Sequence, residues 1–598
     1  MNRPVLSAVI IAFNEESNIN RCIASLDGIA DEVVVVDSGS TDRTVEFAEA
    51  AGARVLHHPF EGHIEQKNWA ARQALGAWLI SLDADEAIGP ELRTSLLEWK
   101  VGDQQCDGYE FNRLTSYCGH WVRHGGWYPD RKCRLWRAGQ AHWTGENPHD
   151  RLELTSGRSP QHLSGDLLHF SYNEIEDHVR QIRFFSDIAA TQYSGPDWMT
   201  WSLIRPLKSA FQWMKNALFR GGWRDGWAGW TIARWSAFAT SEKYRKAAAW
   251  RWKKSVLKHS GREEVQRILL CRTDAIGDVV LTLPIAGRLA KHVQVDALVR
   301  AYAAPVARAS RSVVQVLEWD GDEPLDLSVY DAAILAFPDV EVAKALKHAG
   351  VPLRLGTARR WPFARYINLR HGVSRKHSGQ HEAWHGLDLA HVLQPVPGWV
   401  EPGAMPSQSP EEWAEWAGLE AESWSHVQTR VQGAATWLAP GRSHVILHPG
   451  SNNSATNWSI DQYVKLMRTL MREGHRVIWT GTAKEAEAWP ELALWCEEVD
   501  AVNATGALTL EELMSLIQEV DGLVASSTGP LHLASALGTA CVGLYGTAAP
   551  TWPERWHPMG SRAKWIATSN RTDEGCLDIE VADVAAALLD LGVGAASQ

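Results

Sequence analysis

The sequence predicts an α/β protein in which strands and helices alternate to form mostly parallel sheets. Short apolar runs alternate with helical segments from residue 5 to about residue 90, and similar alternation starts again near residues 267 and 444. Such alternation is typical of parallel sheets covered by helices. The 598 residues are enough for three or four domains. With 22% charged and 45% hydrophobic residues, the composition excludes wholesale disorder and a small disulfide-stapled fold.

The first unit is expected to begin with strand, helix, strand and helix, and to continue with a further strand. The expected strands are residues 5–13, 32–36 and 78–82, and the expected helices are residues 16–26 and 42–51. Asp37 follows the second of these strands, and Asp83 and Asp85 follow the third. Because open α/β sheets bind ligands beyond the carboxyl ends of their strands, these acids are candidate binding residues.

The residues around these acids favour a nucleotide-sugar site. Two carboxylates one residue apart, such as Asp83 and Asp85, can share one Mg²⁺ or Mn²⁺, which would also bridge a diphosphate. A solvated turn is the competing interpretation of the pair alone. The loops after the first two strands suit a nucleotide, because amides at helix N-termini bind phosphate. The donor-binding candidates here are Asn14, Glu15, Asp37, Ser38 and Asp83.

Two further α/β units follow. Residues 267–272 form an expected strand, and Gly277 and Asp278 open the next helix, whose positive end would stabilise an ionised Asp278. The alternative is that Asp278 only caps this helix and has no binding or catalytic role. The last unit starts with a strand at 444–447 and has a helix from about residue 460, with Ser459 at its cap. Its candidate phosphate-binding residues are His448, Gly450, Ser451, Thr528, Gly529, Pro530 and His532, with a packing role as the alternative for the last.

Residues 201–260 form a basic, tryptophan-rich segment. They contain 13 Lys and Arg residues, only two acids and eight of the 31 Trp residues, so their net charge of +11 contrasts with −12 for the whole chain. Indole rings settle at the headgroup level of a bilayer while cations meet anionic lipid, which predicts association with a membrane surface. A solvated helix pair that packs its aromatics on a neighbouring domain is the alternative. Nucleic acid is not expected as a partner, since nothing else in the sequence suits base recognition.

We expect the protein to act in the cytoplasm, peripherally bound to the inner face of the cytoplasmic membrane. Its first residues lack the apolar stretch of a signal peptide, and no 18 consecutive residues are apolar. The eight cysteines form no CxxC pair, which favours free thiols.

The motifs AFNEE, VVVVDSGSTDRT, QKNWAA and LDADE resemble the inverting family-2 glycosyltransferases of the GT-A fold, and among them the lipopolysaccharide core glucosyltransferases. The resemblance covers about residues 5–250 and implies a nucleoside contact for Asp37 and metal and diphosphate contacts for Asp83 and Asp85. Inverting transfer needs a carboxylate that takes the acceptor's proton. The sequence NPHD resembles the family's His–acid pair, so Asp150 is the expected base, with Asp130 as second choice. A plain surface carboxylate is the alternative for both.

The motifs IGDVVLTLP, HPGS, NWS, TGALTLEEL and SSTGPLHLASALG occur in the order of the family-9 heptosyltransferases. These have the GT-B fold and transfer heptose from an ADP-sugar to the lipopolysaccharide inner core. The resemblance runs from about residue 267 to 545 and implies Asp278 as general base and residues 528–532 as the donor-phosphate segment.

Two positions depart from the family-9 pattern. Thr456 stands where many relatives carry a Lys, and Ser527 stands where an acid is common. A missing cation beside a developing diphosphate weakens transition-state stabilisation. The sequence offers Arg272, Arg442 and Lys465 as substitutes.

Together these observations predict four parts and two activities. A GT-A domain (single Rossmann-like, 1–195) precedes a helical membrane-associating segment (196–262), and a GT-B region follows with an acceptor lobe (263–435) and a donor lobe (436–598). We expect transfer of glucose from UDP-glucose and heptose from ADP-heptose to a lipid A-core acceptor, with Mg²⁺ or Mn²⁺ in the N-terminal half only. The alternative is a C-terminal half that only binds acceptor or partner. A nucleotidyltransferase is disfavoured because its Gly-rich, Lys-bearing loop is absent.

Overall fold

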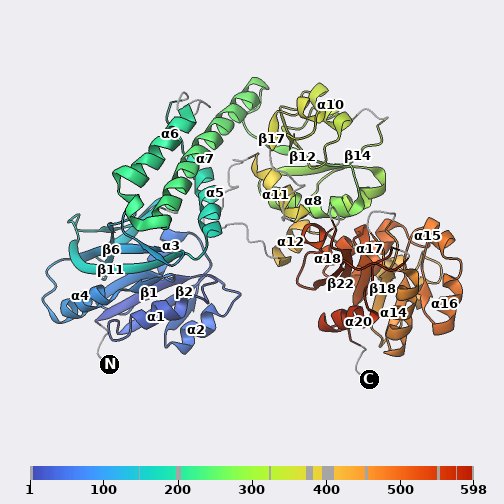
Figure 1. Ribbon diagram of the computed structural model, residues 1–598, viewed down its shortest axis with the longest axis horizontal. Coiled ribbons are helices and arrows are strands. Elements are labelled where there is room, and N and C mark those ends of the chain that lie inside the picture. The colour runs from blue at the N-terminus through green and yellow to red at the C-terminus, as the bar shows by residue number, and fades with distance from the viewer. Residues whose placement is uncertain are drawn as a thin grey trace. The chain divides into compact units, whose positions relative to one another are not determined.

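The protein divides into two compact units after Arg251 (Figure 1). The computed structural model describes residues 5–146, 149–196, 204–321, 325–371, 381–393, 410–451, 456–548, 552–573 and 575–594. Among these residues the first unit has a nine-stranded sheet and a two-stranded hairpin, and the second has two six-stranded parallel sheets. The predicted α/β class is confirmed. The predicted division into four parts stays a prediction.

The first half of the nine-stranded sheet is parallel and has the order β3-β2-β1-β4. Its elements are β1 (Leu6–Ala12), α1 (Ile19–Ser25), β2 (Glu32–Asp37), α2 (Thr44–Ala50), β3 (Arg54–His57), α3 (His63–Gln73) and β4 (Trp78–Asp83). Alternate residues of β1 face opposite sides, so Ile10 packs with α1 and α2 while Val9 packs with α3. Ala12 pairs with Asp37 and Ile11 pairs with Asp83, which brings both acids to one edge of the sheet.

The other half of this sheet is largely antiparallel and continues through β8, β6, β11 and β5. Its strands and helices are β5 (Glu86–Ile88), α4 (Pro90–Val101), β6 (Gly108–Tyr117), β7 (His120–Val122), β8 (Asp130–Arg137), β11 (Gln161–Tyr172) and α5 (Ile175–Thr191). A separate hairpin of β9 (Ala141–Glu146) and β10 (His149–Leu154) carries Asp150, which pairs with Gly145. Asn147 and Pro148 of the NPHD sequence lie outside the described residues.

The described part of the basic segment is mostly helical. It contains α6 (Ile204–Met214), a π-helical turn η2 (Lys215–Phe219), a 3₁₀ turn η3 (Gly222–Asp225) and α7 (Gly226–His259). A Cβ on Gly229 would lie 1.8 Å from the Gly222 carbonyl oxygen, so only glycine allows α7 to pack this closely on the preceding turn. In the part of the chain that the structure describes, no helix combines the length and apolar character needed to cross a bilayer.

The first sheet of the second unit has the order β14-β13-β12-β15-β16-β17 and is parallel throughout. Its strands are β12 (Arg267–Arg272), β13 (Gln294–Val299), β14 (Val316–Glu318), β15 (Ala332–Leu335), β16 (Leu353–Thr357) and β17 (Leu369–His371). Its helices are α8 (Ile276–Leu289), α9 (Ala304–Arg308), α10 (Val340–His348), α11 (Glu382–His391), α12 (Pro410–Ala417) and α13 (Trp424–Val427). The predicted strand at 267–272 is β12, and the helix predicted to open at Gly277 and Asp278 is α8.

The last sheet has the order β20-β19-β18-β21-β22-β23 and is also parallel. Its strands are β18 (His444–His448), β19 (Arg476–Trp479), β20 (Val502–Asn503), β21 (Gly522–Ser526), β22 (Ala540–Gly546) and β23 (Ala563–Thr568). Its helices are α14 (Ile460–Arg472), α15 (Ala483–Ala488), α16 (Leu492–Val499), α17 (Leu510–Glu519), α18 (Gly529–Ala536), α19 (Pro553–Trp556) and α20 (Val581–Asp590). Ser459 caps α14 as predicted, because its hydroxyl accepts a hydrogen bond from the Gln462 amide.

The first turns of α8 and α18 meet where the two sheets of the second unit face each other (Figure 1). A Cβ on Gly277 would lie 2.8 Å from the His532 ring and 3.5 Å from the Gly529 Cα. Glycine at this position therefore lets the two helix starts approach. The contact brings the segment around Asp278 beside the Thr-Gly-Pro segment at the start of α18.

Candidate functional sites

Asp83 lies at the end of β4 between two buried cations. Its carboxylate is 2.9 Å from Lys67 Nζ of α3 and accepts a hydrogen bond from Arg134 Nη2 of β8 at 2.8 Å. Burial disfavours its ionised form, but the charges of Arg134 and Lys67 outweigh burial and hold the pKa of Asp83 well below its usual value. Asp83 is therefore ionised and fixed in position.

Lys67 also connects Asp83 to the predicted base. Its Nζ donates a hydrogen bond of 2.8 Å to Asp150 Oδ2, and its side chain is only 5% exposed. The β9–β10 hairpin thus places Asp150 beside the strand end that carries Asp83. Asp130, the second choice, instead pairs with Arg113 at 2.8 Å and Lys132 at 3.2 Å.

The other predicted donor-binding residues lie at the same edge of the sheet. Asn14 Oδ1 accepts a hydrogen bond from the Thr41 amide at 2.8 Å, which ties the loop after β1 to the loop after β2. Asp37 is buried and accepts hydrogen bonds from the amides of Gly39 and Ser40. Ser38 Oγ accepts one from Gln66 at 3.0 Å. The structure therefore places these three predicted residues together, while their contacts with a nucleotide stay a prediction.

Glu15 is an acid with an unusual environment in this loop. Burial raises its pKa to about 7, the carboxylates of Asp85, Asp42 and Asp83 act in the same direction, and a hydrogen bond from Asn18 opposes them. The site is therefore rich in negative charge on this side and suits a ligand that brings cations or hydroxyl donors.

The residues that could hold a divalent cation near the end of β4 are Asp85 and His169. Asp85 Oδ2 lies 3.2 Å from His169 Nε2 of β11, so a carboxylate oxygen and an imidazole nitrogen converge next to the end of β4. Among the described residues no group of three or more His, Cys, Asp and Glu side chains is arranged to hold a metal. A cation here would thus need diphosphate oxygens to complete its coordination. The role predicted for Asp83 as a second ligand stays a prediction, since that carboxylate is paired with Lys67 and Arg134.

Lys67→Met should destabilise the centre of the first unit, because two acids would lose their shared buried cation. We expect the free energy of opening of β4, measured by amide hydrogen exchange at neutral pH, to fall by about 3 kcal/mol. Lys132→Met removes a cation that is 39% exposed and pairs with Asp130, and it should change this free energy by less than about 0.5 kcal/mol. Equal effects of the two substitutions would contradict the assigned role of Lys67.

A second acidic centre lies at the start of α8 in the second unit. Arg272 at the end of β12 contacts Asp274 at 2.6 Å and also pairs with Asp278. Burial raises the pKa of Asp278 to about 6, with Asp274 and Glu382 acting in the same direction and Arg272 opposing them. A carboxylate with this pKa is mostly ionised at neutral pH and can still accept a proton.

Glu382 connects this centre to the other sheet of the same unit. Its buried carboxylate lies 3.6 Å from Arg272 Nη1 and 3.0 Å from Arg555 Nη2 of α19. Arg272 was one of the cations proposed to neutralise donor phosphate in place of the lysine that Thr456 replaces. Its guanidinium instead lies among three carboxylates, those of Asp274, Asp278 and Glu382. Arg555 is a cation at this junction that the sequence pattern did not single out.

The predicted donor-phosphate residues lie at the start of α18. Thr528 precedes the helix, and Gly529 and Pro530 form its first turn. The Thr528 hydroxyl and His532 Nδ1 are buried and have no hydrogen-bond partner among the described residues. Burial, with a smaller contribution from His557, lowers the pKa of His532 to about 4, so its ring is neutral at pH 7. Two unpaired polar atoms at a helix N-terminus suit a ligand with phosphate oxygens.

The HPGS loop lies at the end of β18. His448 and Ser451 are buried, and burial lowers the pKa of His448 to about 4 while its Nδ1 lies 2.9 Å from the Thr480 hydroxyl. A Cβ on Gly450 would lie 1.7 Å from Glu485 Oε1, so the Glu485 carboxylate at α15 packs directly against this loop. Glu485 could not be predicted as a neighbour of this loop, because no motif in the sequence links the two segments.

The comparisons with known proteins agree with this division. Residues 7–144 match Glycosyl transferase family 2, and residues 327–582 match Glycosyltransferase family 9 (heptosyltransferase). The chain is 30% identical over 232 residues to the lipopolysaccharide core biosynthesis glycosyltransferase LpsC of Rhizobium meliloti, covering 36% of this chain and 83% of LpsC. It is 34% identical over 191 residues to an uncharacterized glycosyltransferase of Rickettsia bellii, covering 30% of this chain and 65% of that protein.

A solved structure also matches part of the chain. Escherichia coli ADP-heptose lps heptosyltransferase II is 21% identical, with a TM-score of 0.45, and the match covers 55% of this chain and 98% of that one. The chain spans about 65% of the length of the first curated relatives it matches. Asp150 and Asp278 lie outside the residues matched to the two families.

The fold and these matches define a glycosyltransferase. The chain belongs to glycosyltransferase family 2 through its N-terminal unit, which is GT-A-like, and it carries a family-9 heptosyltransferase domain, which is GT-B-like, in its C-terminal region. The predicted fusion of two transferase families is confirmed.

Proposed function

We propose that the chain is a bifunctional enzyme of lipopolysaccharide core biosynthesis. Its N-terminal unit transfers a hexose, glucose from UDP-glucose, and its C-terminal unit transfers heptose from ADP-heptose, both to a lipid A-core acceptor. The observation that carries the proposal is that two separate sheets each place ionisable acids beside cations at a ligand-binding edge. The similarity to LpsC, a lipopolysaccharide core biosynthesis glycosyltransferase, and the match to the heptosyltransferase family support it.

In the N-terminal unit, Asp150 takes the proton of the acceptor hydroxyl. The acceptor oxygen then bonds to the anomeric carbon on the face opposite the departing nucleoside diphosphate, which leaves with the bonding electrons and inverts the configuration. Lys67 contacts both carboxylates and so holds Asp150 near Asp83. Asp85 and His169 would hold Mg²⁺ or Mn²⁺, which supplies charge stabilisation for the leaving diphosphate.

In the C-terminal unit, Asp278 takes the acceptor proton while the ADP group leaves. Arg272 fixes the Asp278 carboxylate at the start of α8. The N-terminus of α18, with the unpaired Thr528 hydroxyl, binds the diphosphate of the donor. We expect no metal in this unit, because the N-terminus of α18 carries partial positive charge toward the diphosphate.

The heptose-transfer step should depend on the ionisation of Asp278. Because its pKa is about 6 and only the ionised form accepts a proton, kcat/KM should fall about tenfold per pH unit below pH 6 and reach a plateau above it. The measurement is kcat/KM for heptose transfer at subsaturating acceptor between mildly acidic and neutral pH, with folding checked at each pH by circular dichroism. A profile that stays flat well below pH 6 in folded protein would contradict Asp278 as the base.

We propose that the segment at 196–262 associates with the anionic inner face of the cytoplasmic membrane, where the lipid-linked acceptor is made. Its basic charge and its tryptophans support this placement. Two sites on one membrane-bound chain would act on a shared acceptor at high effective concentration.

A second candidate function is favoured by two positions of the C-terminal unit. Thr456 supplies no positive charge and Ser527 supplies no carboxylate where family-9 relatives carry such groups. Under this alternative the unit binds the core oligosaccharide or a partner without catalysis. Transfer assays with the full chain, UDP-glucose and ADP-heptose, on acceptor lipids from defined stages of core assembly, separate the two. Heptose turnover eliminates the alternative, and hexose turnover alone favours it.

A further inference from the structure

Helix α6 presents its apolar side chains outward. None of its residues is buried, although Leu207, Phe211 and Met214 recur at helical spacing, and Leu207 and Phe211 are 66% and 55% exposed. Leu218 and Phe219 of η2 continue this row and are also exposed. Large apolar side chains clustered on one exposed helix face mark an interaction surface.

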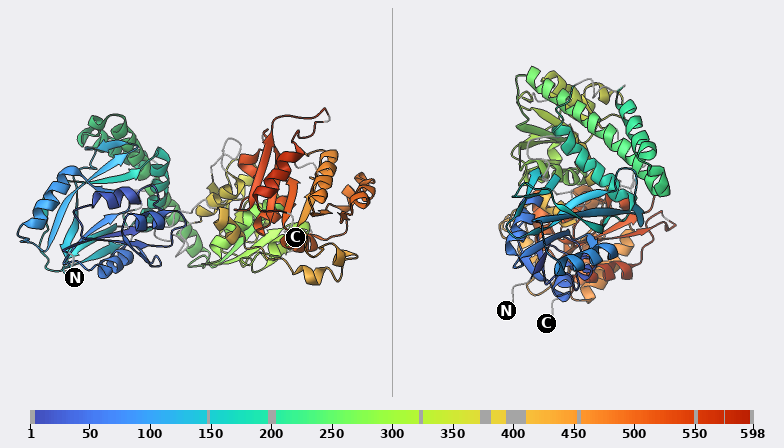
Figure 2. Two further views of the ribbon diagram at one scale, coloured as in Figure 1. Left: turned by 90° about the horizontal axis from the view of Figure 1, so that it is seen from below. Right: turned by 90° about the vertical axis from the view of Figure 1, so that its left-hand side faces the viewer.

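The adjoining part of α7 repeats this arrangement with tryptophans. Trp227 and Trp230 lie three residues apart on α7, Trp223 precedes them in η3, and all three are exposed. The rings of Trp213 and Trp230 lie 5.6 Å apart, which joins the two helices, and α6 and α7 run side by side in the views of Figures 1 and 2. We call this pair, residues 204–259, the helical hairpin.

The charges of the helical hairpin select an anionic partner. Its only acids are Asp225 and Glu242. Asp225 accepts hydrogen bonds from the amides of Arg123 and His124, and Glu242 pairs with Arg245 at 2.6 Å. Both acids are therefore engaged within the first unit, while 13 Lys and Arg residues occur between residues 201 and 260. Tryptophan with an excess of cations matches a lipid headgroup layer better than an apolar protein face.

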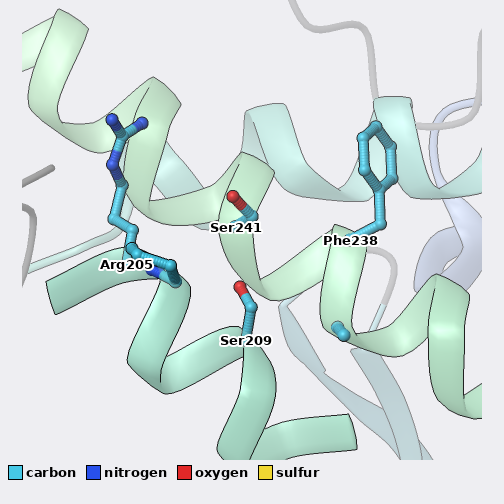
Figure 3. Close-up of a pocket in the computed structure, with 6 residues that line it drawn as sticks. Arg205, Ser209, Phe238 and Ser241 are labelled. Carbon is cyan, nitrogen blue, oxygen red and sulfur yellow. The ribbon is translucent and has the colours of Figure 1, made fainter. Parts of the chain in front are cut away.

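A pocket between the two helices contains unpaired donors. It has a volume of about 390 Å³ and is lined by Arg205, Pro206, Ser209, Ala237, Phe238 and Ser241. Figure 3 shows Arg205 and Ser209 on α6 and Phe238 and Ser241 on α7 around this gap. Arg205 Nε and the Ser209 hydroxyl are buried and have no hydrogen-bond partner among the described residues. Since unpaired buried donors are costly, they indicate a ligand that supplies acceptor oxygens.

From these observations we infer that the helical hairpin docks on a bilayer of anionic phospholipid, with the apolar row of α6 inserted between headgroups and one lipid phosphate seated in the pocket at Arg205, Ser209 and Ser241. The inference rests on the proposed membrane association and adds to it the inserted face and a phosphate site. A guanidinium and two hydroxyls are suitable donors for a phosphate group. Phe238 and Pro206 would contact the lipid next to that phosphate.

The inserted face is tested by flotation of the full chain with vesicles. The wild-type chain should float with vesicles of phosphatidylethanolamine and phosphatidylglycerol and not with phosphatidylcholine alone. The double variant Leu207→Glu with Phe211→Glu should lower the partition coefficient about a hundredfold, because two large apolar side chains no longer leave water. Leu75→Glu, at a leucine of similar exposure outside the hairpin, should leave it unchanged.

The phosphate site is tested with two charge-matched variants in the same assay. Arg234→Gln removes an exposed cation of α7 outside the pocket and should weaken binding about fivefold, the effect of one surface charge. Arg205→Gln should weaken it about tenfold more, because a charged hydrogen bond to the phosphate is also lost. Equal losses would overturn the phosphate site.

The outcomes of flotation are independent of catalysis. If the wild-type chain binds anionic vesicles but the double α6 variant binds equally well, the inserted face is overturned while the membrane proposal stands. If the wild-type chain does not float at low salt, the docking inference and the membrane proposal both fail. Sugar transfer measured on the same preparation decides the proposed transferase activities separately.

Discussion

Asp85→Ala is expected to reduce hexose transfer by the N-terminal unit about a thousandfold without unfolding it. Asp85 is the carboxylate that faces His169 next to the end of β4. A divalent cation held there would interact with the charge that develops on the leaving diphosphate and would stabilise the transition state by several kcal/mol. Its loss leaves Asp83 with both of its cations, Lys67 and Arg134, so the sheet edge should persist. The measurement is glucose transfer from UDP-glucose with saturating Mn²⁺.

The matched control for this variant is Asp103→Ala, which removes an exposed acid after α4 and should leave transfer unchanged. Amide exchange in β4 should be the same in both variants. Undiminished turnover by Asp85→Ala would refute the metal site. A parallel loss of exchange protection would instead assign Asp85 a structural role.

Asp278→Asn should reduce heptose transfer about a thousandfold, the contribution of a positioned general base. The amide keeps the shape of the side chain, and Arg272 retains Asp274 and Glu382 as partners, so the start of α8 should stay folded. The measurement is single-turnover heptose transfer from ADP-heptose by the full chain. Asp320→Asn, at an exposed acid of the same unit, serves as the control and should have no effect. A wild-type rate of heptose transfer in Asp278→Asn would contradict the assignment of Asp278 as the general base.

The parallel parts of the fold could be predicted because apolar patterning is local. The expected strand at 78–82 is β4 (Trp78–Asp83), and the expected helix at 42–51 is α2 (Thr44–Ala50). The antiparallel strands from β5 to β11 were not predicted. Their partners are distant in sequence, and half-exposed strands such as β8 lack a continuous apolar run.

The sequence also predicted only part of each candidate site, namely the acids but not the residues that pair with them. An acid that directly follows an apolar run can be recognised in the sequence as the end of a strand, so Asp37 and Asp83 could be predicted. The partners that set their charge state were not found, because Arg134 and His169 come from strands far along the chain. Glu382 was missed for the same reason, since only the folded unit brings it between two arginines.

The most direct test of the account is a crossed assay of one chain with two donors. Full-length wild type, Asp85→Ala and Asp278→Asn are each supplied with UDP-glucose and with ADP-heptose on core acceptor lipids. Two independent sites predict that Asp85→Ala loses only hexose transfer and Asp278→Asn loses only heptose transfer. A single activity that both substitutions abolish, or no heptose transfer by the wild-type chain on any acceptor, would contradict a bifunctional enzyme.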